Sequence, residues 1–70
     1  MTVKEIAVNQ WFKRVRDGRI FVRLAGEEAV VDDANCVPVK PLQPTLRLQG
    51  FYMPAEEPVE AYKYNFLRVA

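Results

Sequence analysis

The chain of 70 residues contains no histidine, no serine and only one cysteine. Without histidine or serine it cannot assemble the Ser-His or Cys-His pairs of nucleophilic enzymes, and it lacks the usual proton shuttle near neutral pH. One cysteine without histidine cannot supply the ligands of a zinc site. The three glycines are isolated in the sequence, so there is no glycine-rich phosphate loop. These absences predict a protein that is not an enzyme and that holds neither a metal nor a cofactor.

Acidic residues are the remaining source of catalytic groups, and most of them occur in short pairs. A paired-carboxylate hydrolase must hold its two acids across a cleft, and a chain of 70 residues has little material to build one. The sequence Asp33, Ala34, Asn35 resembles the start of a calcium-binding loop, but Val37 replaces the next oxygen ligand. We therefore interpret the acids as solvated residues of loops and turns: Glu27, Glu28, Asp32, Asp33, Glu56, Glu57 and Glu60.

The single cysteine, Cys36, excludes an internal disulfide and favours a reducing compartment. No cation near it in the sequence would activate its thiol, so we expect a small, partly buried hydrophobic side chain. The first residues do not form a secretory signal, and no apolar run reaches membrane-spanning length. We expect a cytoplasmic protein that does not contact membranes.

The composition is ordinary for a globular protein, with 50% hydrophobic residues, 27% charged residues and a formal net charge of +1. It predicts one small domain, residues 1–70, with a thin core. A core of this size rarely supplies more than roughly 3–5 kcal/mol of stability, so a partner or a second copy could contribute to it.

Residues 11–24 carry the clearest structural signal, which is that of a β-hairpin. Asp17 and Gly18 favour a two-residue type I′ turn, which needs positive φ at both positions and would place Phe12 opposite Arg23. Because side chains alternate along a strand, one face is apolar and holds Trp11, Lys13, Val15, Ile20, Val22 and Leu24. The opposite face, called here the Phe/Arg face, holds Phe12, Arg14, Arg16, Arg19, Phe21 and Arg23.

Residues 2–10 are compatible with two structures. Thr2 and Glu5 fit a capping box, so a short helix is one of them. A strand that runs into Trp11 is the other. The helix is favoured because the capping pair has a mechanism and the strand alternation is imperfect; its buried face would hold Val3, Ile6, Ala7 and Gln10.

After the hairpin, Gly26 and Glu27 favour a type II′ turn that leads into a third strand at residues 29–32. This arrangement predicts a three-stranded meander. It would place Asp32 across from Phe21, near Arg19 or Arg23, where it would partly neutralise the basic face.

Prolines at positions 38, 41 and 44 predict an extended polyproline-like crossover over residues 37–44 and exclude a central strand there. The spacing of the basic residues does not fit a PxxP ligand of SH3 domains. Residues 45–50 are compatible with a strand or with one helical turn, and the strand is preferred. Residues 53–58 form an acidic loop bracketed by prolines. Residues 59–69 alternate as a closing strand with Tyr62, Tyr64 and Phe66 on one side.

These elements predict a mainly β fold: a small antiparallel sheet, or an SH3-like or OB-like barrel, of four to five strands with at most one short N-terminal helix. An α+β sheet with one packed helix is the alternative.

The Phe/Arg face supplies the functional hypothesis. Arginines bind phosphates or carboxylates, and exposed phenylalanines stack on unpaired bases, so single-stranded DNA or RNA is one candidate ligand. A structural interpretation is that Arg14 covers Phe21 and Arg23 covers Phe12 in cation–π pairs. A third is that both rings lie in a core covered from both sides.

Charge decides between these ligands. Residues 11–25 carry a net charge of +4 and residues 26–33 carry −4. A dedicated nucleic-acid reader is usually strongly basic, whereas a dipolar surface suits an orientation-specific protein partner. We expect a non-enzymatic module, an adaptor or inhibitor of the kind found among phage and accessory-genome proteins. Its partner-binding residues would be Phe12, Arg14, Arg16, Arg19, Phe21 and Arg23. A self-associating structural subunit is a further alternative.

Overall fold

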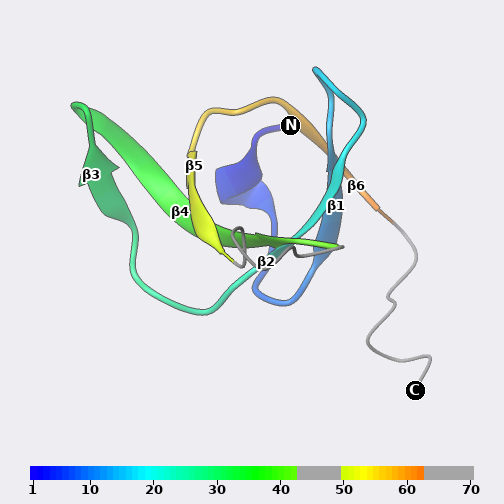
Figure 1. Cartoon of the computed structure of the whole chain (residues 1–70), viewed down its shortest axis with the longest axis horizontal. Helices are drawn as coiled ribbons and strands as arrows, with labels where there is room; N and C mark the ends of the chain where they lie inside the picture. Colours follow the sequence, from blue (N-terminus) through cyan, green and yellow to red (C-terminus); the bar gives the residue numbers. More distant parts are fainter. Residues whose placement is uncertain (43–49, 63–70) are drawn as a thin grey trace.

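A computed structural model of the chain describes residues 1–42 and 50–62, which form one antiparallel sheet of six strands (Figure 1). The strands are β1 (Trp11–Arg14), β2 (Ile20–Arg23), β3 (Ala29–Val31), β4 (Ala34–Pro41), β5 (Phe51–Pro54) and β6 (Val59–Ala61). Their order is β3-β4-β2-β1-β6, and β5 also pairs with β4. The predicted antiparallel β fold is confirmed, with six strands where four to five were expected.

The N-terminal segment forms a single 3-10 turn, η1 (Val3–Glu5), in place of the expected short helix. A carboxylate oxygen of Glu5 accepts hydrogen bonds from the backbone N–H and the hydroxyl of Thr2, at 3.3 and 3.2 Å. The turn stops because Ile6 is already extended, with φ −79° and ψ 131°. Val3 and Ile6 are buried as predicted, whereas Ala7 is exposed.

The first hairpin is present, but its register differs from the predicted one by two residues. Phe12 pairs with Phe21 rather than with Arg23. Gly18 has a φ of 71°, but Asp17 does not have positive φ, so the type I′ turn does not form there. A four-residue loop replaces it, closed by a 2.8 Å hydrogen bond from Gly18 N–H to the carbonyl of Arg14. Because the shift is an even number of residues, the residues of β1 and β2 keep their predicted faces, whereas Val15 and Arg16 belong to the loop.

The predicted meander is wrong, because β3 pairs with β4 and not with β2. Val31 pairs with Ala34, which leaves Asp32 and Asp33 as a two-residue turn with φ of 50° and 64°. Positive φ at both positions is the type I′ geometry that had been expected at Asp17 and Gly18. Asp32 therefore lies at the tip of the β3–β4 hairpin and does not face Phe21.

Two prolines lie inside β4, so the expectation that they exclude a strand is wrong. Pro38 lies between the part of β4 that pairs with β3 and the part that pairs with β2. Its carbonyl accepts a 3.0 Å hydrogen bond from Leu24 N–H. Leu42 N–H donates to the carbonyl of Ile20 in β2, so the nitrogen of the preceding Pro41 faces the other side of β4. On that side β5 begins opposite Val39 and does not reach Pro41. Both prolines stand where the ladder tolerates a missing donor.

The later part of the chain is divided differently from the prediction. Met53 and Pro54 belong to β5, so the acidic loop is shorter than expected and begins at Ala55. The closing strand begins at Val59 as predicted and pairs with β1. Residues 45–49 of the strand expected at 45–50, and Tyr64 and Phe66 of the closing strand, lie outside the described residues, and Gly50 precedes β5 without belonging to a strand.

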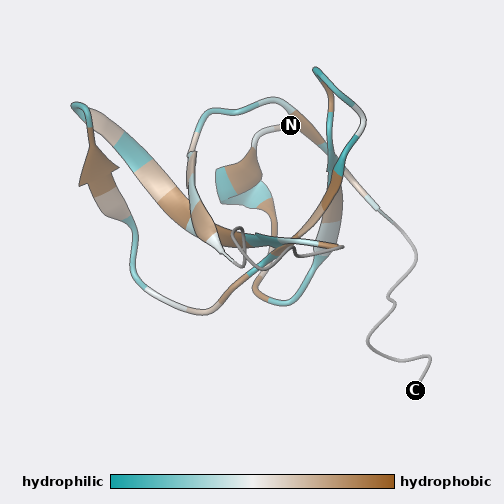
Figure 2. Ribbon diagram, in the orientation of Figure 1, coloured by the Kyte–Doolittle hydropathy of each residue, from teal (hydrophilic) through white to brown (hydrophobic). Residues whose placement is uncertain are grey.

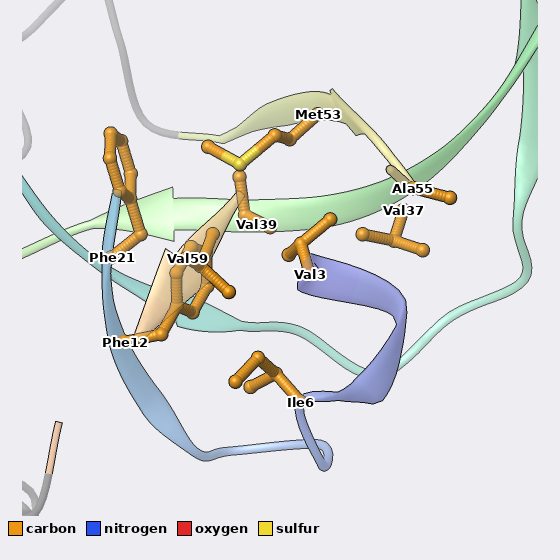
Figure 3. Close-up of a cluster of buried hydrophobic side chains, with 9 residues drawn as sticks. All are labelled: Val3, Ile6, Phe12, Phe21, Val37, Val39, Met53, Ala55 and Val59. Carbon is orange, nitrogen blue, oxygen red and sulfur yellow. The ribbon is translucent and has the colours of Figure 1, made fainter. Parts of the chain in front are cut away.

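The core lies inside the curve of the sheet, on the side of Phe12 and Phe21 (Figure 3). The N-terminal turn fills this concave side, where Val3 N–H bonds Glu57 O and Lys4 N–H bonds Ala55 O, both at 3.1 Å. The nine core residues come from the N-terminal segment and five strands or their ends: Val3, Ile6, Phe12, Phe21, Val37, Val39, Met53, Ala55 and Val59. Trp11, Val22 and Cys36 are also buried but do not belong to this cluster.

Candidate functional site

The two phenylalanines of the Phe/Arg face are core residues. Phe12 is 0% exposed and Phe21 is 2% exposed. Their rings stack at a centroid distance of 5.7 Å, and Phe51 meets Phe21 edge-on at the same distance. In this fold the rings hold the sheet together and do not present a surface to a ligand.

Arg14 packs against the margin of that core. Its guanidinium carbon lies 4.9 Å from the centroid of the Phe21 ring, which confirms the predicted cation–π contact. The same guanidinium binds the carboxylate of Asp17 through Nε at 3.1 Å and Nη2 at 2.5 Å. This pairing, with help from Arg19 N–H, lowers the pKa of Asp17 to about 2 and raises the pKa of Arg14. Arg14 is thus engaged by its own hairpin.

Arg23 is engaged by the N-terminal segment. Its Nη1 donates to the carbonyl oxygens of Lys4 and Ile6, at 3.0 and 2.8 Å. Because Phe12 faces Phe21, Arg23 is not opposite Phe12 and the second predicted cation–π pair does not form. Arg23 anchors η1 against the end of β2.

Arg16 and Arg19 are the members of the Phe/Arg face that remain exposed, both at the tip of the first hairpin. The side chain of Arg16 is 66% exposed, and its Nε lies 3.9 Å from a carboxylate oxygen of Glu57. The structure therefore divides the six predicted binding residues into four that support the fold and two that can meet a partner.

Sequence reasoning missed a second surface, on the outer side of β3, β4 and β5. Strand register places its members on one face, because Cys36 pairs with both Ala29 and Pro54, and Pro38 pairs with Tyr52. Where β4 lies between β3 and β5 they are all apolar or aromatic: Ala29, Val31, Ala34, Cys36, Pro38, Tyr52 and Pro54. The exposed Lys40 continues the same side of β4 beyond this set. We call this set the outer β3–β5 face.

Several members of the outer β3–β5 face are open to solvent. Tyr52 is 49% exposed and Val31 is 43% exposed, whereas Cys36 is buried between its neighbours. Val30, on the other side of β3, is 70% exposed. Figure 2 shows β3 as a hydrophobic strand at the edge of the molecule, away from the curve that encloses the core. The alternation of apolar residues from Ala29 to Pro38 could have revealed this face, but the prolines led to the prediction that residues 37–44 are not a strand.

Acidic residues border this surface. Glu27 and Glu28 precede β3, Asp32 and Asp33 form the turn that follows it, and all of them are exposed. The basic tip with Arg16 and Arg19 belongs to the other hairpin. The dipolar charge distribution seen in the sequence is therefore carried by two separate hairpins.

Within residues 1–42 and 50–62, no three His, Cys, Asp or Glu side chains are grouped so that they could hold a metal ion. No helix in the same ranges is long and apolar enough to cross a membrane. Comparison with known proteins found no matching family, no matching curated protein and no matching solved structure.

Proposed function

We propose that the protein is a non-enzymatic binding module that docks a specific protein partner through the outer β3–β5 face. The observation that carries this proposal is an apolar surface, continuous over three paired strands, on which Val31 and Tyr52 remain about half exposed. Scattered exposed hydrophobic residues are normal in soluble proteins, but a contiguous set bordered by charges is typical of a protein-binding site.

The chemistry of the surface favours a protein over a nucleic acid. Tyr52, on β5, supplies a large contact with few rotatable bonds, and the acids that flank β3 favour a partner with basic residues beside an apolar patch. Phosphates would be repelled by the same border. The nucleic-acid alternative depended on stacking by Phe12 and Phe21, and both rings are buried.

The test compares two lysine substitutions at positions of equal exposure. Tyr52→Lys places a charge on the outer β3–β5 face, whereas Val8→Lys places one at a residue that is 50% exposed and outside the sheet. We expect a tagged protein to recover one stoichiometric partner from host lysate. Recovery should persist with Val8→Lys and be lost with Tyr52→Lys, while circular dichroism shows both variants folded. Equal recovery by the two variants would place the interface elsewhere.

A further inference from the structure

Within residues 1–42 and 50–62, one edge of β3 has no strand beside it. Among the described residues, β4 is the only strand that pairs with it. A two-residue turn makes Val31 and Ala34 a hydrogen-bonded pair, and the alternation of an antiparallel ladder leaves Val30 between bonded positions. The carbonyl of Asn35, the residue opposite Val30, bonds Ala55 N–H on the far side of β4 at 2.8 Å, which agrees with this register. The N–H and C=O of Val30 therefore point away from the sheet.

The charges around this edge determine which strand could add to it. If a second copy added antiparallel about Val30, Glu28 of each copy would approach the Asp32–Asp33 turn that directly follows β3 in the other. The like charges that would meet at both ends of β3 disfavour that dimer. A strand with basic residues at the same positions would form two favourable pairs instead.

We propose that the partner adds an extended segment to the free edge of β3, with alternating apolar side chains and a basic residue at each end. This inference rests on the proposed function and specifies the partner's chemistry. Backbone hydrogen bonds to Val30 supply affinity, and the acids on both sides of β3 supply selectivity. Side chains of the added strand would extend the outer β3–β5 face beside Val31.

The first experiment uses the unchanged protein and two synthetic peptides. Both alternate valine with threonine; one carries lysine at each end and the other carries glutamate. We expect the lysine-ended peptide to bind about ten-fold more tightly in calorimetry, with the difference shrinking at high salt. The Val30 amide should become protected from hydrogen exchange on binding. Equal binding by the two peptides, or no protection at Val30, would overturn the proposal.

The second experiment removes the outward donor. Val30→Pro deletes an N–H that the sheet does not use, and Ala29 is already extended, as a residue before proline prefers to be. The matched control, Val30→Thr, keeps the N–H and the β-branched shape. We expect Val30→Pro to weaken binding of the lysine-ended peptide about ten-fold and Val30→Thr to leave it within about two-fold.

The two proposals fail in different ways. A lysate partner that is lost with Tyr52→Lys but kept with Val30→Pro would support docking on the face and overturn strand addition. A partner insensitive to Tyr52→Lys, together with a peptide that protects Val30, would overturn the face and support strand addition. Light scattering that showed the unchanged protein as a dimer dissociated by Val30→Pro would assign the edge to a second copy and overturn the basic partner.

Discussion

At the scale of single residues, arginine explains why the first hairpin was interpreted as a recognition surface. Arginines beside phenylalanines on one face are what a ligand-binding strand presents, yet a long side chain can also cover an apolar core and end in a polar contact. Arg14 does so with Asp17, and Arg23 does so with two carbonyl oxygens of the N-terminal segment. Those partners lie in a loop and in a distant segment, so the strand pattern alone could not separate the two roles.

The Asp17 carboxylate gives a prediction at this scale. Its pKa falls from 3.8 to about 2 because Arg14 hydrogen-bonds and neutralises it. A lowered native pKa stabilises the fold above pH 4, and that contribution is lost as the pH falls from about 4 towards 2. We expect the NMR titration of the Asp17 carboxyl carbon to have its midpoint near 2.

The matched variant for this prediction is Asp17→Asn, which keeps the shape and removes the titrating group. The difference in unfolding free energy between the unchanged protein and Asp17→Asn should decrease as the pH falls from about 4 towards 2. It should also narrow in high salt, since the pair is partly exposed. An ordinary midpoint near 4 for Asp17 would show that the Arg14 contact does not persist in solution.

At the scale of elements, sequence patterns located most strands but not their neighbours. Alternation correctly sorted the side chains of β1 and β2 into two faces, because that result survives an even shift of register, whereas Val15 and Arg16 of the predicted faces lie in the hairpin loop. Which face is the core depends on long-range contacts of Phe12 with Val3 and Val59, which no local pattern records. The prolines of β4 led to a wrong prediction for a similar reason, because their effect also depends on long-range neighbours. Their missing donors matter only where a neighbouring strand needs them, and neighbours are set by topology.

The β3–β4 turn gives the prediction at this scale. Asp33 has a φ of 64°, a conformation that glycine and asparagine adopt readily and that a β-branched residue resists. We expect Asp33→Gly to stabilise the protein by up to about 1 kcal/mol and Asp33→Val to destabilise it by about 1–2 kcal/mol in urea unfolding. Asp33→Asn removes the charge but keeps the conformational tolerance, so it should stay within about 0.5 kcal/mol of the unchanged protein. Equal stability of the valine and asparagine variants would rule out a type I′ turn here.

At the scale of the whole molecule, the sequence already contained the charge separation, and the fold determines what it does. The exposed arginines Arg16 and Arg19 lie at the tip of the first hairpin, and four acids flank the exposed strand β3. The exposed apolar surface at β3 therefore lies beside the acidic residues. The site predicted from the sequence lies in the basic segment instead. A free β-edge with valines on both faces is a site of self-association unless charges oppose it.

If the acids keep β3 from pairing with itself, reversing one of them should change the oligomeric state. In an antiparallel dimer about Val30, Glu28→Lys replaces the repulsion between residue 28 of one copy and the Asp32–Asp33 turn of the other by attraction, and the two-fold axis repeats this contact. Each favourable charge contact contributes about 0.2–1 kcal/mol, and the repulsion at both contacts is removed as well. The association constant measured by sedimentation should therefore rise about ten-fold. Glu60→Lys makes the same change of charge on β6 and should leave association unaffected. Adding Val30→Pro to Glu28→Lys should restore the original association constant, since it removes the two N–H donors that join the copies. A Glu28→Lys protein that associates no more strongly than the Glu60→Lys protein would mean that charge does not control this edge.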